Sequence, residues 1–239
     1  SGTAMTFECE AVFPKKASVN STGYYPYSEL TSSIFGIHTP KTASVNGAPT
    51  DQVHQTTWAD TDSANFQVFL HREEAESKNV KFILTSSKNT LDFVQAGNSD
   101  VERLGLSSSL FYDVYDNQRW NFAVRIKPKT YPFHPFVSGS DERTDDEKNL
   151  YQLDFYGVSY VGGVKRDSFY LTASFHEERG DEFLFSPKRL YIGAHRTNFT
   201  GAILQKADMK VSSPRVWLTN LSNDEIDAHA RDAANYGVD

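Results

Sequence analysis

The sequence predicts an all-β protein, an antiparallel β-sandwich with one short C-terminal helix. Segments in which apolar and polar residues alternate recur along the chain, and this period of two is typical of half-buried strands. Aromatic residues, which favour strands, make up 13% of the 239 residues. Abundant Ser, Thr, Asn and Asp suit the polar turns that join such strands. This combination argues against a helical bundle.

The chain is expected to form a single domain over residues 1–239, which can be a module in, or a fragment of, a larger protein. The length suits one large β domain, and no internal repeat, low-complexity segment or Pro/Gly-rich linker divides it. The single cysteine excludes an intrachain disulfide framework and a multi-cysteine zinc site.

The charge and hydropathy of the chain exclude several classes of partner. A formal net charge of −7 argues against nucleic acids and anionic membranes, because both bind basic surfaces. No run of about 18 apolar residues is present, so no membrane-spanning helix is expected. The sequence also lacks a basic start followed by an apolar stretch, so no signal peptide is expected in this chain.

The N-terminal half contains four expected strands, at residues 5–13, 32–38, 65–72 and 79–86. In the first, apolar side chains alternate with polar ones. Cys9 falls on the apolar face, and Glu8 and Glu10 fall on the opposite face, which we interpret as solvated. The last two strands flank a charged turn and are expected to form a hairpin. Residues 39–57 show no periodicity and are expected to be a long loop.

The C-terminal half contains four further expected strands, at residues 119–127, 150–160, 168–175 and 189–194. Residues 206–218 are expected to form one bulged strand or two short ones, because Pro214 interrupts them. Gly157 is expected to form a turn or bulge within its segment, and Gly162 with Gly163 a hairpin turn. A helix is expected to begin at Ser222, because Glu225 follows three residues later in a capping box, and to end near Ala233.

Five motifs in the second half carry a family resemblance. They are Arg119–Val124 (W-hydrophobic-x-V), Leu153–Val158, Leu190–Gly193 (L-x-I-G), Phe199–Gly201 (F-x-G), and Arg215–Trp217 followed by Leu221–Ile226 (L-S-x-x-E-I). In this order they resemble the concanavalin A-like, laminin G-like jelly rolls over residues 119–231. The resemblance implies a jelly-roll sandwich. The superfamily includes lectins, adhesion modules, polysaccharide hydrolases and lyases, and domains of virus and phage particles.

The sequence contains no catalytic motif that would select an enzyme. The E-x-D-x-x-E pattern of the glucanase branch is absent, and so are Gly-x-Ser-x-Gly and the histidine spacings of zinc proteases. Cys9 is interpreted as a buried core residue rather than a nucleophile. A polysaccharide hydrolase or lyase would need paired carboxylates, or a Tyr/His/Arg set, gathered on one sheet face.

Aromatic residues in expected loops are candidate ligand-binding residues, because flat rings contact the C–H faces of sugars. They are Tyr24, Tyr25, Tyr27, Trp58, Tyr131, Phe133, His134 and Phe136. Three interpretations remain open for them: sugar contact, a protein interface, and packing over the ends of the sandwich.

An acidic loop is a candidate calcium site, because Ca²⁺ takes six to eight oxygen ligands. Its candidate ligands are Asp141, Glu142, Asp145, Asp146 and Glu147. The alternative interpretation is a solvated acidic loop with no cofactor.

These observations favour a non-catalytic binding or structural module of a surface assembly. Its role would be carbohydrate recognition, adhesion, or structure in a virion or tail. Its partners would be glycans, protein subunits or further copies of the chain, and its location extracellular or on a virion surface. The alternative is a polysaccharide-active hydrolase or lyase of the same jelly-roll fold.

Overall fold

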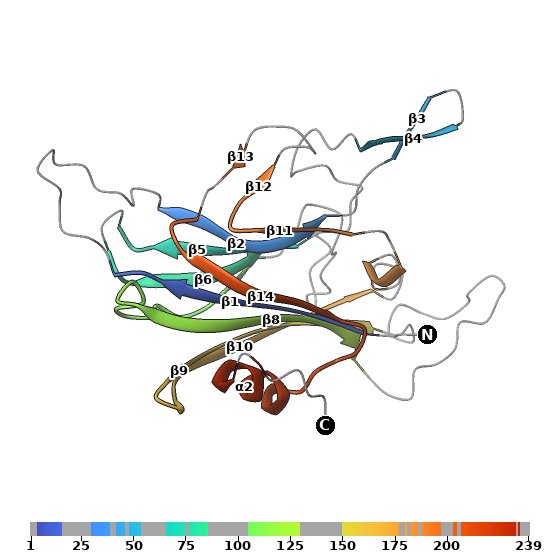
Figure 1. Cartoon of the computed structure of the whole chain (residues 1–239). Helices are drawn as coiled ribbons and strands as arrows, with labels where there is room; N and C mark the ends of the chain where they lie inside the picture. The colour runs from blue at the N-terminus through green and yellow to red at the C-terminus, as the bar shows by residue number, and fades with distance from the viewer. Residues whose placement is uncertain are drawn as a thin grey trace, which may run out of the picture.

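A computed structural model describes residues 4–15, 30–38, 42–45, 48–53, 66–74, 77–85, 105–129, 150–176, 180, 183–185, 188–196, 203–204, 207–232 and 234. Within these residues, two five-stranded antiparallel sheets lie face to face, and one helix packs on the outside of one of them (Figure 1). The predicted all-β antiparallel sandwich with a C-terminal helix is confirmed. No helix in the described part of the chain is long and apolar enough to cross a membrane.

The first sheet, here sheet A, contains in spatial order β10 (Val164–His176), β9 (Leu150–Val161), β8 (Gln118–Pro128), β1 (Met5–Phe13) and β14 (Lys210–Trp217). Sheet B contains β11 (Arg189–Ile192), β2 (Thr31–His38), β5 (Phe66–Arg72), β6 (Val80–Thr85) and β7 (Gly105–Ser107). Two short ribbons join β3 (Thr42–Val45) to β4 (Ala48–Val53) and β12 (His195–Arg196) to β13 (Ile203–Leu204).

The hydrophobic core lies between the two sheets and is largely aromatic. The apolar face predicted for β1 is buried there, and Cys9 is 1% exposed. Burial raises the pKa of the Cys9 thiol, as expected for a structural cysteine. Trp120 of β8 is fully buried and packs 4.8 Å from Phe82 of β6, ring centre to ring centre. Ring contacts of this kind pack sheet A against sheet B.

The loop expected over residues 39–57 is partly wrong, because it contains β3 and β4. These strands pair in an antiparallel ribbon, with Val45 opposite Ala48 and Thr42 opposite Val53. Their segments are rich in Thr, Ser, Pro and Asp and carry no apolar alternation. A two-stranded ribbon is held by its backbone hydrogen bonds, so the periodicity that reveals a half-buried strand is missing.

Gly157 does not form the turn or bulge that the sequence predicts. It lies in the middle of β9, opposite Phe169 of β10, and a Cβ added there would lie 2.3 Å from the Phe169 ring. The glycine therefore makes room for an aromatic ring in the core. The chain reverses five residues later, at Gly162 and Gly163, whose φ angles are +58° and +80°. The hairpin turn predicted at these two glycines agrees with that geometry.

Replacing Gly157 with alanine is expected to lower the free energy of unfolding by about 1–3 kcal/mol, because the new methyl group overpacks the core against Phe169. Urea denaturation measures the change. Gly162→Asn is the control, since nothing lies within 4 Å of a Cβ at that position and asparagine tolerates a positive φ. A loss at Gly157 no larger than that at Gly162 would show that Phe169 is not tightly packed there.

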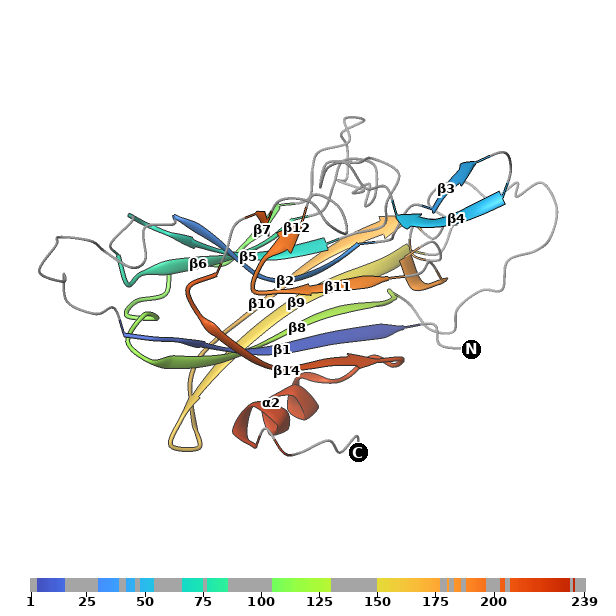
Figure 2. The same cartoon turned by 45° about the horizontal axis from the view of Figure 1, so that its top comes forward.

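Helix α2 (Asn223–Arg231) has the predicted capping box. The Glu225 amide donates to the Ser222 hydroxyl at 3.2 Å, and the Glu225 carboxylate accepts from the Ser222 amide at 2.6 Å. The helix ends two residues before the predicted Ala233. Figure 2 shows it lying against the outer face of sheet A, away from sheet B. Ile226 and Ala230 form a second apolar cluster there with residues of β8 and β9.

The docked helix makes one prediction about β1 wrong. Glu8 and Glu10 are on the outer face, as the alternation requires, but they are only 2% and 8% exposed. The alternation distinguishes the two faces of a strand without showing what covers each of them. The outer face of sheet A is therefore a second, partly polar interface rather than a solvated surface.

Candidate functional site

The ligand-binding and metal-binding residues predicted from the sequence all lie outside the described residues. The aromatic candidates are Tyr24, Tyr25, Tyr27, Trp58, Tyr131, Phe133, His134 and Phe136, and the calcium candidates are Asp141, Glu142, Asp145, Asp146 and Glu147. Both sets remain predictions. Among the described residues, no three His, Cys, Asp or Glu side chains gather as metal ligands would.

A pocket lies at one end of sheet A, where the β9–β10 turn meets the segment before β8 and the C-terminal end of α2. Its volume is about 530 Å³, within the range of small-molecule sites. We call it the arginine pocket, and it is lined by Asp116, Asn117, Gln118, Arg119, Tyr160, Val161, Gly162, Gly163, Arg166 and Arg231.

Local backbone geometry shapes the walls of the arginine pocket. Gly162 and Gly163 adopt positive φ angles at the tip of the hairpin, and without side chains they leave the backbone open to a ligand. Asn117, which also has a positive φ of 64°, accepts a hydrogen bond from the Lys15 amide at 2.9 Å. That bond holds the turn before β8 against the end of β1, so the wall is fixed in the folded chain.

Arg231 lies over the ring of Tyr160 at the mouth of this pocket. Its guanidinium carbon is 5.2 Å from the ring centre, and its Nη2 donates to the Tyr160 hydroxyl at 3.4 Å. The Tyr160 residue is only 9% exposed, whereas Arg231 is exposed. The tyrosine thus contacts the guanidinium while the arginine side chain stays accessible to solvent.

The other two arginines differ in how they are held. Arg119 lies 3.4 Å from Glu10 through its Nε and donates to the Ala230 carbonyl, so it ties β8 to the end of α2. Arg166 lies 3.3 Å from Asp167, and the two side chains are 45% and 36% exposed. An exposed ion pair of this kind is weak and exchanges easily. Arg166 is therefore available to a ligand in a way that Arg119 is not.

The side chains that line the arginine pocket carry an excess of positive charge, although the chain as a whole is acidic. Three arginines line it, against one acidic side chain among its lining residues, Asp116. That carboxylate is 3.3 Å from Lys15 and 3.9 Å from Lys78, so two lysines offset its charge. The described walls therefore suit an anionic or strongly hydrogen-bonding ligand.

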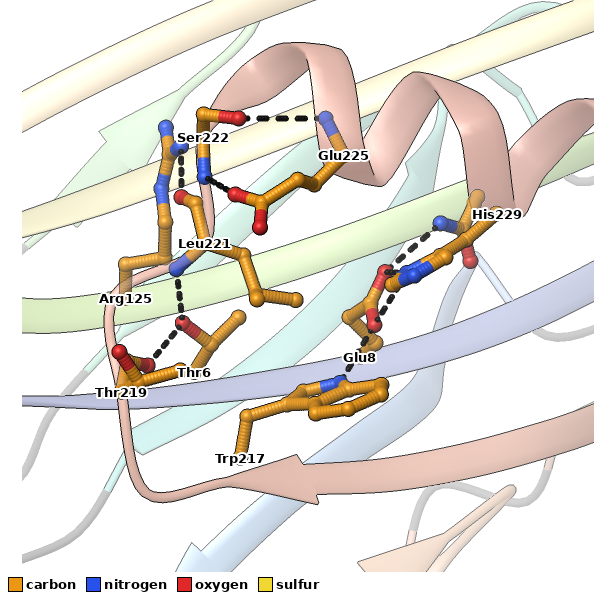
Figure 3. Close-up of polar contacts among 10 residues, drawn as sticks. Thr6, Glu8, Arg125, Trp217, Thr219, Leu221, Ser222, Glu225 and His229 are labelled. Carbon is orange, nitrogen blue, oxygen red and sulfur yellow. Dashed lines mark hydrogen bonds and ion pairs between the residues drawn. The ribbon is translucent and has the colours of Figure 1, made fainter. Parts of the chain in front are cut away.

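Glu8 is the centre of a buried cluster that joins α2 to sheet A (Figure 3). Its carboxylate accepts from Trp217 Nε1 at 2.7 Å, from Asn121 Nδ2 at 3.2 Å, and from His229 Nδ1 at 3.0 and 3.1 Å. Since a carboxylate only accepts, the histidine Nδ1 is the donor. The rings of Trp217 and His229 stack with centres 5.4 Å apart. This carboxylate has three donors and no access to a substrate, so its role is structural.

A second carboxylate on the same face, Asp154 of β9, is fully buried. One oxygen accepts from the Tyr170 hydroxyl at 2.8 Å and from Gln152 Nε2 at 2.5 Å. The other lies 3.5 Å from Arg125 Nε and 3.4 Å from Lys127 Nζ, which is ion-pair distance without hydrogen-bond geometry. Two cations and two donors thus surround a carboxylate beneath a tyrosine that is 46% exposed.

The arginine pocket was not predicted from the sequence. Its walls come from three separate segments, residues 116–119, the hairpin residues 160–166, and Arg231, and no local pattern brings these together. One signal was visible: Gly162 and Gly163 mark a hairpin tip, and Arg166 follows closely. A basic side chain beside a glycine turn indicates an accessible cation, but not which other residues lie next to it.

No family model and no curated protein matches the sequence. Solved structures that resemble the chain include the following two. One is the enzymatically active domain of bacteriophage CBA120 tailspike protein 2, with 10% identity and a TM-score of 0.45, covering 98% of this chain and 25% of that chain. The other is alginate lyase Aly36B in complex with alginate tetrasaccharide, with 11% identity and a TM-score of 0.32, covering 73% of this chain and 59% of that chain. This chain spans about a quarter of the first and about three fifths of the second. Both scores are too low to assign it a fold or a function.

Proposed function

We propose that this chain is a non-catalytic glycan-binding module of a larger extracellular or virion assembly, and that it binds its glycan in the arginine pocket. One observation carries the proposal: a hollow of about 530 Å³ whose walls combine arginine donors with an exposed backbone turn. Sugars present many hydroxyl acceptors over a small volume, and such walls can match them.

The lining of the arginine pocket supports a sugar ring better than a flat apolar ligand. Val161, 56% exposed, offers an apolar contact for sugar C–H groups. The glycines beside it let a ring approach the backbone closely. The predicted aromatic loops and the calcium loop remain part of the proposal, as additional contacts outside the described residues.

The buried acids support a binding role over hydrolysis. A glycosidase needs two carboxylates that reach the scissile bond, one of them as a proton donor. On the outer face of sheet A, Glu8 and Asp154 are buried and occupied by protein donors. Neither can reach a sugar without displacement of α2 or of the Tyr170 ring, so this pair of carboxylates does not suit that reaction.

A lyase is the second candidate, and the Asp154 cluster is the observation that favours it. An exposed tyrosine with arginine, lysine and glutamine nearby is a set that could act on a uronate. Burial and the hydrogen bond to Asp154 raise the pKa of Tyr170, however. A tyrosine acting as a base requires the opposite shift, so we place this candidate behind the binding module.

Binding to a glycan array tests the proposed function. We expect the intact chain to bind at least one glycan class, and we expect Arg166→Gln to weaken that binding about tenfold, because one charge-assisted hydrogen bond is lost. Lys81→Gln is the matched control, since it removes the same charge from an exposed position on sheet B. Absence of binding across the array, or an equal loss in both variants, would contradict the proposal.

A further inference from the structure

We infer that the arginine pocket takes a sugar that bears a carboxylate, with Arg231 and Arg166 as its two anchors. The inference rests on the proposed function and adds the chemical class of the ligand. It begins from the charge of the walls. Three arginines face one aspartate there, and two lysines already offset that aspartate. Arg119 is already paired with Glu10 and Arg166 with Asp167. An anionic sugar could pair with Arg231 and replace Asp167 as the partner of Arg166, whereas a neutral sugar could not.

Arg231 is held beside the pocket by two contacts with Tyr160. Its guanidinium carbon lies 5.2 Å from the ring centre, and its Nη2 donates to the Tyr160 hydroxyl at 3.4 Å. The planar fork of an arginine matches the two oxygens of a carboxylate, and a fork that is already oriented loses less conformational entropy on binding. The contacts with Tyr160 therefore favour binding of a carboxylate without adding a contact to it.

Arg166 can turn toward the same anion at little cost. Its partner is Asp167, the next residue in the chain, at 3.3 Å, and the two side chains are 45% and 36% exposed. Such a pair contributes little to stability, so exchanging Asp167 for a ligand carboxylate is nearly neutral for the fold. Arg119, in contrast, is already bound by Glu10 and by the Ala230 carbonyl, so we do not count it as an anchor for the ligand.

The charge of the whole chain limits which anions fit. A net charge of −7 repels a polymer of high charge density. At physiological ionic strength charges are screened beyond about 8 Å, so the local field of the arginines dominates for a single carboxylate within the pocket. We therefore commit to a sparsely charged glycan carrying uronic or sialic acid residues, rather than to a densely sulfated one.

The test compares carboxylated glycans with the same glycans after reduction of the carboxyl group, together with sulfated glycans, on one array with the intact chain. We expect binding to carboxylated glycans to exceed binding to their reduced forms about tenfold or more, as one charge-assisted hydrogen bond predicts. Equal binding to both forms, or preference for sulfated glycans, would overturn the inference and leave the proposed function standing. Absence of all glycan binding would overturn the proposed function itself.

Variants assign the effect to the two anchors. The double variant Arg166→Gln with Arg231→Gln should lose about tenfold to a hundredfold in affinity for the carboxylated glycan, and much less for its reduced form. Lys81→Gln with Lys210→Gln changes the net charge equally, at exposed sites away from the pocket, and should bind normally. Arg231→Lys keeps the positive charge but loses the planar guanidinium. Its affinity for the carboxylated glycan should lie between those of the unchanged chain and the arginine double variant. Equal losses of affinity in the two double variants, or unchanged affinity of the arginine double variant for the carboxylated glycan, would overturn the inference.

Discussion

Replacing Asp154 with alanine is expected to destabilise the fold by about 3–5 kcal/mol. The side chain of Arg125 is only 4% exposed and lies 3.5 Å from the Asp154 carboxylate. Without that carboxylate, the buried guanidinium retains the Leu221 carbonyl, to which its Nη1 donates at 2.8 Å, but no opposite charge at this distance among its described contacts. The variant also removes the acceptor of the Tyr170 hydroxyl. Urea denaturation monitored by tryptophan fluorescence measures the loss.

Asp116→Ala is the matched control for this experiment. Its carboxylate also lies near two cations, Lys15 and Lys78, but its side chain is 41% exposed. Exposed pairs contribute about 0–1 kcal/mol because water and salt screen them. If both alanine variants lose the same stability, burial of the Asp154 carboxylate is not what makes it important.

Replacing Glu8 with alanine is expected to cost a similar amount, about 3–5 kcal/mol, and to loosen α2 selectively. Three donors lose their acceptor: Trp217 Nε1, Asn121 Nδ2 and His229 Nδ1. Each buried donor left without a partner costs about 1–3 kcal/mol. Because His229 lies on α2, the interface between that helix and β1 opens first. Hydrogen exchange should therefore rise in peptides covering residues 217–231 before it rises in sheet B.

Two further variants separate the Glu8 cluster from general destabilisation. Glu8→Gln keeps the shape of the side chain and one carbonyl acceptor, so it should lose less stability than Glu8→Ala. Glu225→Gln weakens the capping box of the same helix at a partly exposed site and should cost about 1 kcal/mol or less. Uniform exchange across the whole chain in Glu8→Ala would contradict a selective effect on α2.

The strands with clear alternation were the part of the fold that the sequence could predict. The apolar face of β1, the β5–β6 hairpin and the capping box at Ser222 all rest on local patterns, and the structure confirms each of them. A local pattern reports on neighbours within a few residues. It identified α2 but contained nothing to show that the helix would cover Glu8.

Local patterns could not predict the candidate site either, because its residues lie far apart in the sequence. Arg119, Tyr160 and Arg231 belong to three different elements, and their approach depends on how α2 docks on sheet A. The sequence therefore directed attention to aromatic and acidic loops, where composition is unusual. Those loops lie outside the described residues, and their predicted roles still await a test.

The position of β1 between β8 and β14 has a consequence for synthesis of the chain. Glu8 accepts a hydrogen bond from Trp217, 209 residues later in the sequence, so one edge of β1 lacks its native partner until β14 has left the ribosome. Contacts between such distant segments slow folding, because a large loop must close first. During that interval an exposed strand edge can pair with other nascent chains. We expect the protein to depend on chaperones or low expression temperature for yield, and to tolerate C-terminal truncation poorly once β14 is removed.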